Sequence, residues 1–516
     1  MRSTAWLGRW QSGAAILSAA VLYALACPPY EWSWTAWIVP GLLLVPTWRL
    51  PPLARFASGL LFGVAMGYGV AAWLPHATLE YFRFNWLFAA GFAVAVYAIY
   101  AGIPYGLLTF LYGAAAARVP ASARAPLAAW LWVGAELVRT HLFTGLPWEL
   151  LGHTQSPHLW LVQIADLGGV YAVSFVMVLT SVAAAELLQE STQQHTLRAG
   201  SLRRMILPAA TLLCMVAYGL HSRALHDRVT DERVRTVAVV QGNIANAFRW
   251  QRAFVERTLA TYLDLTRTLR SVHPDLVVWP ENAVSFYIDR EARLRGRLGE
   301  AAGIADEGLL VGAPRLGSDE RAHNSVYLIG PDATIRGTYD KRRLVPFAES
   351  DPFGFGNGDA RSGYTDWVPG ATADPLRAAS FSLGTVICYE VLFPHLVREL
   401  VRNGAELLVN VSNDSWLDRG DGVAPRQQFS MAVFRAIETR RALVRAASSG
   451  VSGFITPFGA VQALVPAGEA GTAVAPVTLR SGLTPYVRWG DAWAVVGSVL
   501  AAAQVLRRRR SAPLSA

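Results

Sequence analysis

The chain has 516 residues, of which 53% are hydrophobic, and this length exceeds that of one ordinary domain. The net charge is +9, but its polar half has no Lys/Arg-rich patch interleaved with aromatic residues, so we expect no nucleic-acid partner. The three cysteines fit neither a metal-binding spacing nor a disulfide framework, and we expect no metal or cofactor. The apolar excess and the 18 Trp residues indicate a membrane protein.

Eight apolar segments predict membrane-spanning helices, because a bilayer core needs about 20 apolar residues in a helix. Seven precede residue 222 and one lies near the C-terminus; they cover residues 11–27, 34–47, 55–74, 86–116, 125–139, 165–187, 205–221 and 489–506. The first could also be a secretory signal peptide, but further spans follow it at once, which favours a retained helix. The fourth contains Gly102 and Pro104, which predict a kink or two half-spans.

Arginines predict the orientation of these spans, because cytoplasmic loops carry an excess of positive charge. With eight spans, the arginines beside them all fall on one side: Arg2, Arg9, Arg49, Arg55, Arg118, Arg124, Arg198, Arg203, Arg204 and residues 507–510. That side is then the cytoplasm, with both termini on it. The long segment between the seventh and eighth spans is expected on the periplasmic side of the inner membrane.

This segment, residues 222–488, has frequent charges and short apolar runs that alternate with helical stretches. Six runs predict strands, at residues 234–240, 276–279, 309–312, 325–329, 385–389 and 407–411. Four stretches predict helices, at residues 253–271, 291–302, 394–402 and 427–445. The strands are apolar throughout, as in a sheet covered on both faces, so we expect an α/β layer fold. The chain thus divides into a seven-helix bundle (1–221), an α/β domain (222–488), and a last helix with a basic tail (489–516).

Three short sequences place an ionisable group just after an apolar run. They are Trp279-Pro280-Glu281-Asn282, the stretch from Tyr339 through Lys341 to Glu349, and Ile387-Cys388-Tyr389-Glu390. Such groups meet where loops leave the carboxyl edge of an α/β sheet. Cys388 has no partner for a disulfide, because Cys27 and Cys214 lie in apolar segments. It is therefore either a buried spectator, as free cysteines often are, or a nucleophile.

Together these residue types can perform acyl transfer without a histidine. The reactive form of a cysteine is the thiolate, a carboxylate can take the thiol proton, and a lysine can stabilise an oxyanion. Taken singly, each residue has a plainer interpretation: a solvated strand end for Glu281, an exposed charged face for Lys341 and a core thiol for Cys388. Their occurrence together, in this order, favours the catalytic interpretation.

The three sequences resemble, in order, the signature regions of the nitrilase (carbon–nitrogen hydrolase) superfamily, whose catalytic triad is Glu–Lys–Cys. Residues 410–416, Asn-Val-Ser-Asn-Asp-Ser-Trp, resemble a further common region. With the spans, nearly the whole chain resembles the apolipoprotein N-acyltransferase family, including residues 240–250, which end at Trp250, and residues 144–148, which end at Trp148. The chain departs from the family at Ala348, where Gly is common, and in a short loop at 350–370.

The resemblance implies a nitrilase-like αββα sandwich with an eight-helix membrane bundle, and a reaction in two steps. Glu281 would be the general base. Cys388 would be the nucleophile that forms a thioester with an acyl chain of a phospholipid, in the family usually phosphatidylethanolamine, and Lys341 would stabilise the oxyanion. The N-terminal amine of a diacylglyceryl apolipoprotein would then accept the acyl chain. The resemblance also implies that Glu349 is a second carboxylate beside Lys341.

Further residues are expected near the site or in the bundle beneath it. Tyr389 and Glu390 flank the nucleophile, and they either shape the site or only pack and pair. Trp148 and Trp250 either line a lipid entrance or anchor the chain at the membrane interface. Glu136 and Arg139, one helical turn apart in the fifth span, are expected to pair with each other rather than with a lipid headgroup.

Two other functions stay open at this point. One is a membrane-anchored nitrilase-type amidase that hydrolyses a C–N bond with the same triad, although eight spans are more than an anchor needs. The other is a non-enzymatic protein whose outer domain only binds a partner. In each case we expect the chain to be a monomer.

Overall fold

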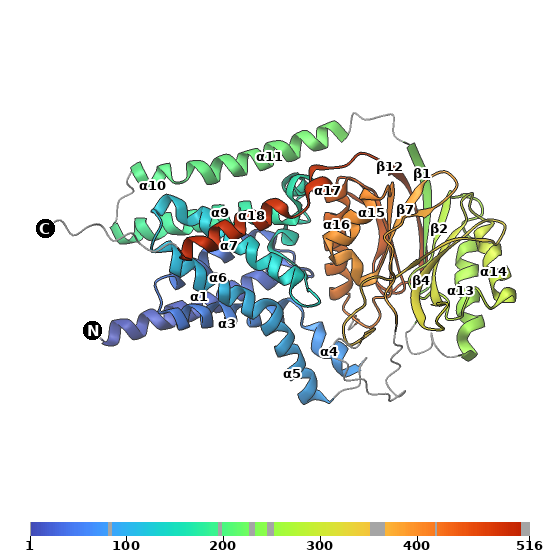
Figure 1. The fold of residues 1–516 in the computed structure, drawn as a ribbon, viewed down its shortest axis with the longest axis horizontal. Coiled ribbons are helices and arrows are strands. Elements are labelled where there is room, and N and C mark those ends of the chain that lie inside the picture. The colour runs from blue at the N-terminus through green and yellow to red at the C-terminus, as the bar shows by residue number, and fades with distance from the viewer. Residues whose placement is uncertain are drawn as a thin grey trace. The chain divides into compact units, whose positions relative to one another are not determined.

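The computed structural model describes residues 2–80, 85–194, 199–226, 233–244, 252–350, 367–417 and 420–506, which form two compact units (Figure 1). Unit 1 comprises Met1–Ala72, Leu87–Arg223 and Trp489–Ala516, and unit 2 comprises Trp73–Trp86 and Ala224–Arg488. Unit 2 thus includes a short helix, α4 (Trp73–Glu80), from within the N-terminal part of the chain. Trp250 and most of the loop predicted at 350–370 lie outside the described residues.

Unit 1 is helical, and each of the eight predicted spans contains a helix. Its longer helices are α1 (Arg2–Ala26), α2 (Val39–Thr47), α3 (Pro52–Val70), α5 (Trp86–Tyr97), α6 (Ile103–Ala116), α7 (Ala121–His141), α9 (Ala165–Gln194), α11 (Ile206–His226) and α18 (Ala492–Leu506). Within the described ranges, four stretches are long and apolar enough to cross a membrane: Pro52–Val70, Trp86–Ala116, Ala165–Gln193 and Gly200–Ala224. The segments Gly13–Ala26, Ser33–Thr47 and Ala492–Gln504 are apolar but shorter.

The second predicted span is not one continuous helix. A 3-10 turn, Ser33–Trp37, precedes α2, and Pro40 lies in the first turn of α2. A proline costs little in a first turn but removes a hydrogen bond from a helix interior, so the helix begins anew just before Pro40. In the fourth span, a π-helical turn, Ala98–Gly102, separates α5 from α6 at the place where Gly102 and Pro104 predict a kink.

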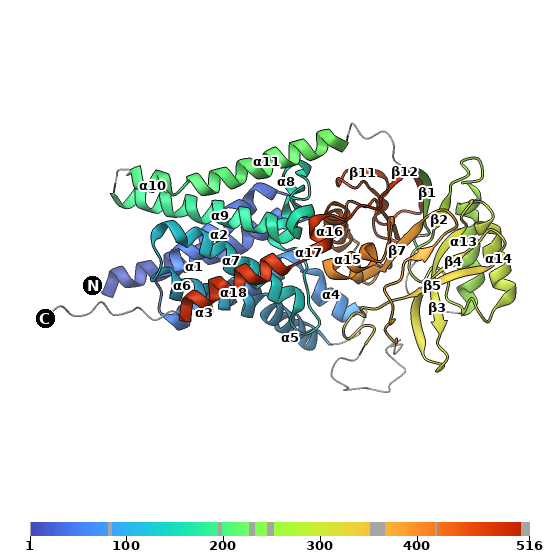
Figure 2. The ribbon, with the colours of Figure 1, turned by 45° about the horizontal axis from the view of Figure 1, so that its top comes forward.

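Glycines let α3 and α6 approach closely. A Cβ atom on Gly59 would lie 2.1 Å from the carbonyl oxygen of Tyr105 in α6, and one on Gly63 would lie 2.5 Å from the carbonyl carbon of Ala101 in the π-helical turn before α6. Small residues spaced four apart commonly allow such close packing of membrane helices, where van der Waals contact replaces the hydrophobic driving force. The helices of unit 1 run alongside one another over most of its length (Figure 2).

Unit 2 contains two six-stranded sheets. The first has the order β12-β1-β2-β3-β4-β5 and the second the order β11-β10-β9-β8-β7-β6. The strands of the first sheet are β1 (Arg233–Gln241), β2 (Leu276–Val278), β3 (Leu309–Leu316), β4 (Ala322–Ile329), β5 (Ile335–Asp340) and β12 (Gly471–Leu479). The strands of the second are β6 (Leu376–Arg377), β7 (Ser382–Ile387), β8 (Leu407–Ser412), β9 (Leu443–Ala447), β10 (Ser452–Ile455) and β11 (Val461–Val465).

The sheets stack face to face and helices cover their outer faces, which gives an αββα arrangement (Figures 1 and 2). The helices α13 (Val255–Arg267) and α14 (Ala292–Ala302) pack on the first sheet, and α15 (Pro394–Arg402) and α16 (Val423–Thr439) pack on the second. Alternate residues of β1, β2 and β3 form an apolar core with α13 and α14, and Trp279 stacks on Tyr262 in that core. Because both faces are covered, β2, the second half of β1 and most of β3 are buried, as their apolar runs predict.

All six predicted strands are present, but several boundaries differ: β3 runs on to Leu316, α13 ends at Arg267 rather than at 271, and α16 begins at Val423. Two further boundaries are wrong because a left-handed residue ends the element. The strand predicted at 385–389 ends at Ile387, because the next residue turns into a left-handed conformation that a strand cannot continue. The helix predicted at 427–445 ends at Thr439, where Arg440 adopts a left-handed cap with φ +51°, and β9 then begins at Leu443. Apolar residues continue across this junction, so their pattern does not mark the change from helix to strand.

Candidate active site

The predicted site residues follow strands that end at one edge of the stacked sheets. Glu281 comes just after β2, Lys341 after β5 and Cys388 after β7. The turn that carries Glu281 lies directly against β3 at Gly312. A Cβ on Gly312 would lie 2.5 Å from the Pro280 carbonyl oxygen and 2.6 Å from the Glu281 Cα, so only glycine permits this approach.

Lys341 lies between two carboxylates. Its Nζ is 3.2 Å from Glu281 Oε1 and 2.8 Å from Glu349 Oε1, and its side chain is 1% exposed. Burial alone would lower the pKa of Lys341, but the two carboxylates together outweigh burial and hold this pKa well above its usual value. The ammonium is therefore charged throughout the physiological range. The structure brings together Glu281, Lys341 and Glu349, which sequence reasoning proposed.

Glu281 is fixed by donors on both oxygens. Oε1 accepts from Lys341 and from Asn324 Nδ2 at 2.7 Å, and Oε2 accepts from the backbone N–H of Asn413 at 2.7 Å. Asn324 Nδ2 also donates to Glu349 Oε1 at 3.0 Å, so one amide bridges both carboxylates. Asn324 was not predicted from the sequence, because a single amide in β4 has no motif of its own.

Cys388 sits at a sharp turn between β7 and a 3-10 helix, Cys388–Leu392. Its φ is +51°, a left-handed conformation that is uncommon outside glycine and that marks strain at functional positions. Burial, reinforced by the charge of Glu281 and opposed by Lys341, raises the pKa of the Cys388 thiol to about 12. At neutral pH the sulfur is therefore protonated and needs a base in order to react.

Glu390 joins the Cys388 turn to the Lys341 loop. Its buried carboxylate accepts from the backbone N–H groups of Ile387 (2.7 Å), Arg342 (2.7 Å) and Arg343 (3.0 Å), and from the Tyr339 hydroxyl. These hydrogen bonds hold together the two loops that carry Cys388 and Lys341. The ring of Tyr389, 7% exposed, packs edge-to-face on Phe393.

Trp148 lies in unit 1 and is 5% exposed, in the loop that follows α7. Arg139 Nη2 donates to the Trp148 carbonyl oxygen at 2.8 Å, and Glu136 Oε1 accepts from the backbone N–H of Leu151 at 2.9 Å. Glu136 and Arg139 were expected to pair with each other; they are electrostatically coupled, but their hydrogen bonds go to this loop, to Trp132 Nε1 and to the Tyr105 hydroxyl. An unpaired backbone group is costly in an apolar bundle, which explains why Glu136 and Arg139 bond to backbone groups of the loop.

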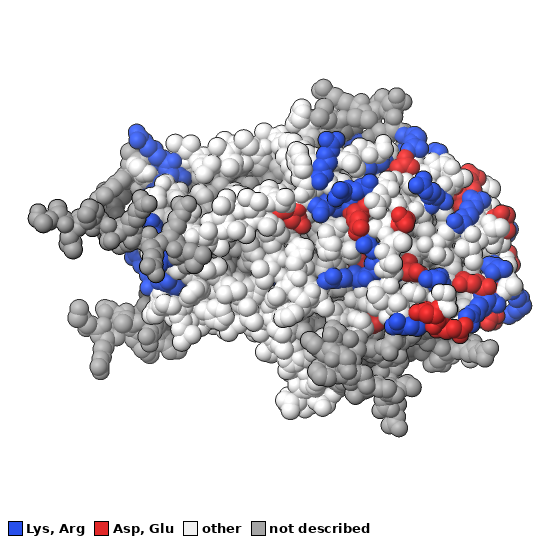
Figure 3. All heavy atoms as spheres, in the orientation of Figure 1, with Lys and Arg blue, Asp and Glu red and all other residues white. Residues whose placement is uncertain are grey.

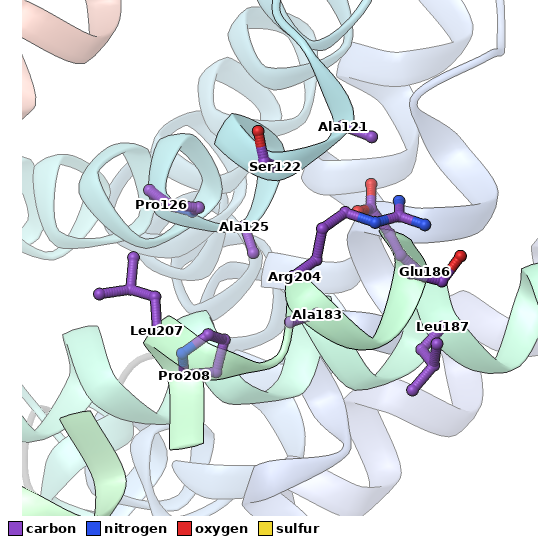
Figure 4. A pocket seen from close by; sticks show the side chains of 11 residues that line it. Ala121, Ser122, Ala125, Pro126, Ala183, Glu186, Leu187, Arg204, Leu207 and Pro208 are labelled. Carbon is purple, nitrogen blue, oxygen red and sulfur yellow. The ribbon is translucent and has the colours of Figure 1, made fainter. Parts of the chain in front are cut away.

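A pocket in unit 1 contains none of the predicted catalytic residues (Figure 4). Its walls come from the start of α7, from α9 and from the segment 201–208, and include Glu186 and Arg204. Over the ranges that the structure describes, no group of three or more His, Cys, Asp or Glu side chains could hold a metal ion.

The geometry in unit 2 suits covalent chemistry at sulfur. A neutral thiol, a hydrogen-bonded carboxylate and a permanently charged ammonium meet in a buried site, and a second carboxylate holds the ammonium from its other side. A carboxylate can accept the thiol proton, and a fixed positive charge stabilises the anion formed when sulfur attacks a carbonyl. The electrostatic interaction of these charged groups with the reacting atoms is strongest where water is excluded.

Comparisons with known proteins cover both units. Residues 19–183 match the family model of the apolipoprotein N-acyltransferase N-terminal domain, and residues 236–482 match that of the carbon–nitrogen hydrolases. The chain is similar to the apolipoprotein N-acyltransferase of Geobacter metallireducens, with 34% identity over 96% of this chain and 95% of that protein. It is 30% identical to that of Pseudomonas putida over 94% of both. Among solved structures, a carbon–nitrogen hydrolase from Helicobacter pylori is 17% identical and covers 54% of this chain and 96% of its own, with a TM-score of 0.38.

Proposed function

The chain belongs to the apolipoprotein N-acyltransferase family, and from that premise we propose that it moves an acyl chain from a phospholipid to the N-terminal amine of apolipoproteins through a thioester on Cys388. The observation that supports the proposal most directly is the position of Lys341 between Glu281 and Glu349. Lys341 is also electrostatically coupled to the buried thiol of Cys388. Glu281, Lys341 and Cys388 are the proposed catalytic residues.

In the first step, Glu281 takes the Cys388 proton as the sulfur attacks the ester carbonyl carbon of the phospholipid. A C–S bond forms, and the carbonyl electron pair moves to oxygen, where the Lys341 ammonium stabilises the oxyanion. Collapse of this intermediate breaks the ester C–O bond. The lysophospholipid oxygen leaves with the proton held by Glu281, and the thioester remains.

In the second step, the amine of the diacylglyceryl-cysteine attacks the thioester carbon. Glu281 accepts the amine proton, the C–S bond breaks, and the proton passes to the departing sulfur to restore the thiol. The attacking amine is the neutral form, which has the lone pair, and the combined charge of −1 on Glu281, Lys341 and Glu349 disfavours an anionic acceptor. Glu349 keeps Lys341 in position through both steps.

The protein is a multi-pass protein of the bacterial inner membrane, supported by its family and by four long apolar helices. We further propose eight spans, with residues 222–488 on the periplasmic side and both termini in the cytoplasm. Arginines at one end of unit 1 support this orientation: Arg49 and Arg124 both lie over Trp48, and Arg204 pairs with Glu190. Figure 3 shows basic side chains, all arginines in this unit, at that end and a largely uncharged surface along the side of the unit in view.

A lipid donor gives a physical reason for joining this chemistry to a membrane bundle. Each CH₂ group that leaves an apolar environment costs about 0.8 kcal/mol, so withdrawing a whole acyl chain into water is prohibitive. We propose apolipoproteins with a diacylglyceryl group as the acceptors, in line with the names of the relatives, and phosphatidylethanolamine as the donor, which the resemblance to the family implies.

Mass spectrometry of the purified full-length protein after incubation with phosphatidylethanolamine tests the proposal. We expect one acyl adduct on the peptide that contains Cys388, which a diacylglyceryl peptide with a free amine then discharges. Cys388→Ala should give no adduct, and Cys214→Ser, which removes an exposed cysteine of α11, should leave adduct formation unchanged. Rapid release of free fatty acid without an amine acceptor would support the hydrolase alternative instead.

A further inference from the structure

A group of buried polar side chains lies behind Cys388, where β8 and β9 pack against α16. Its members are each at most 1% exposed: Asn410, Ser412, Asp414, Gln428 and Arg445. None is among the site residues predicted from the sequence. A buried ion pair is weak evidence for stability, because removing two charges from water costs about as much as their attraction returns. The group therefore calls for an explanation in terms of the site.

Arg445, in the middle of β9, holds this group in a single arrangement. Its Nη2 donates to both carboxylate oxygens of Asp414, at 2.9 and 2.8 Å, and to Gln428 Oε1 at 2.7 Å. Its Nη1 donates to Asn410 Oδ1, and its Nε to the Val451 carbonyl oxygen at 3.2 Å. The planar guanidinium presents its donors in a fixed fork, so these partners cannot rotate independently.

Two routes lead from Arg445 to Cys388. Asn410, oriented by Arg445, donates from Nδ2 to the carbonyl oxygens of Val386 (3.2 Å) and Cys388 (3.4 Å), at the turn where the backbone becomes left-handed. Asp414, paired with Arg445, accepts from Ser412 Oγ at 2.5 Å. Ser412 is also a hydrogen-bond partner of the Cys388 sulfur, and this contact lowers the thiol pKa.

Ser412 has one hydroxyl proton for three acceptors: Asp414, the Cys388 sulfur and, at 3.5 Å, Gln428 Oε1, which already accepts from Arg445. The negative charge of Asp414 also raises the pKa of the Cys388 thiol. Both effects disfavour the thiolate, and both weaken when the charge of Asp414 is compensated by Arg445. The pair therefore influences whether the hydroxyl proton is directed to Asp414 or to the sulfur.

We propose that Arg445 and Asp414 form a charge-compensated pair that positions Cys388 and leaves the Ser412 hydroxyl free to turn toward the sulfur as negative charge develops there. The inference rests on the proposed role of Cys388 as nucleophile. Ser412 contacts the reacting atom, whereas Arg445, Asp414 and Asn410 act through other groups and are positioning residues. No covalent bond changes in this step, since the hydroxyl only rotates from one acceptor to the other.

The pH dependence of Cys388 alkylation by iodoacetamide, followed in the full-length protein by mass spectrometry of the Cys388 peptide, tests the proposal. Asp414→Asn removes the opposing charge, and we expect the rate at pH 8 to rise about tenfold. Arg445→Gln leaves Asp414 uncompensated, and we expect the rate to fall about tenfold. The charge-neutral double variant should return to within about threefold of the parent rate, because the two changes share one interaction.

Ser412 and a second buried pair supply the controls. Ser412→Ala should lower the alkylation rate at pH 8, and Ser412→Thr, which keeps the hydroxyl, should restore it. Glu438→Gln breaks the pair of Arg435 and Glu438 in α16, also 1% exposed on both sides and 2.7 Å long. It should lower the unfolding temperature without moving the pH profile of Cys388.

If the role is electrostatic, Asp414→Asn should raise the Cys388 alkylation rate and Arg445→Gln should lower it. A purely structural role would change the rate of both variants in the same direction. Shifts of the same sign, or unchanged profiles in variants that unfold as cooperatively as the parent, would overturn the proposal. Failure of the proposed function is recognised separately, since the parent protein would then form no acyl adduct on Cys388. In that event the alkylation profiles still decide whether Arg445 and Asp414 control the thiol.

Discussion

Two charged clusters surround Cys388, one built on a lysine and the other on an arginine. Lys341 bridges Glu281 and Glu349 on the segments that follow β2 and β5 of the first sheet, and the formal charge of this cluster is −1. Arg445 pairs both oxygens of Asp414 in the second sheet, and that pair is neutral. An ammonium is a compact charge with rotatable donors that can turn toward a transient oxyanion, whereas a guanidinium fork fixes its partners. The difference separates a group suited to chemistry from a group suited to positioning.

The largest expected effect tests whether the lysine cluster contains the base. Glu281→Gln keeps the shape of the side chain but cannot accept the Cys388 proton, and we expect acyl-enzyme formation to fall about 10³-fold. Single-turnover formation of the Cys388 adduct measures this rate. The control is Glu256→Gln, at an exposed carboxylate paired with Arg293 and Arg297, which should leave the rate unchanged. A loss of less than about tenfold would show that another group takes the proton.

The next largest effects come from replacing each cation by the other residue type, Lys341 by arginine and Arg445 by lysine. Lys341→Arg places a larger planar group in a space 1% exposed between two carboxylates, and we expect acylation to slow about 10²-fold. Arg445→Lys keeps the charge but loses the fork, and we expect a smaller loss of about tenfold, because it acts only through other residues. Both rates come from the same single-turnover assay. An Arg445→Lys loss that exceeded the Lys341→Arg loss would reverse the assignment of roles.

A third test uses the pH dependence of the thiol. Burial and Glu281 raise the pKa of Cys388 to about 12, so the thiolate, which is the basic form, increases as pH rises toward that value. Without a lipid donor, alkylation of Cys388 should therefore increase about tenfold for each pH unit up to pH 10, with no plateau near the usual thiol pKa of about 8.5. A short cysteine peptide alkylated in the same mixture serves as the reference for an unperturbed thiol. A plateau for Cys388 below pH 9 would mean that the resting sulfur is already ionised.

The sequence predicted the lysine cluster better than the arginine cluster, for a physical reason. Glu281, Lys341 and Cys388 each follow an apolar run, so pattern and chemistry coincide at strand ends. Arg445 lies inside the apolar run of β9, where a single charged residue gives no signal of its partners. Its contacts to Asp414 and Asn410 depend on the register of β8 beside β9, which only the folded sheet establishes.

The fold, like the site, was predicted from the sequence only in part. The continuous strands β1, β3, β4 and β8 and the helices α14 and α15 were found from apolar runs and helical periodicity. Six of the described strands were missed: β5, β6, β9, β10, β11 and β12. Of these, β5 and β11 are largely exposed and β12 is only partly buried, which gives no continuous apolar run. The start of β9 lies inside the helix predicted at 427–445. The left-handed turns at Cys388 and Arg440 were also missed, since neither position is a glycine or an asparagine.

The smallest expected effect asks how far the lysine cluster depends on a close backbone approach. Gly312→Ala would push its Cβ to 2.5 Å from the Pro280 carbonyl oxygen and displace the turn that carries Glu281. We expect the free energy of unfolding to fall by about 2 kcal/mol, as in other overpacked sites, and acylation to slow several-fold. Gly296→Ala in α14, where a Cβ meets nothing within 4 Å, is the matched control and should raise stability by about 0.5–1 kcal/mol. If Gly312→Ala changed stability without changing acylation, the turn would tolerate displacement, and the position of Glu281 would be set by Asn324, Lys341 and the Asn413 N–H instead.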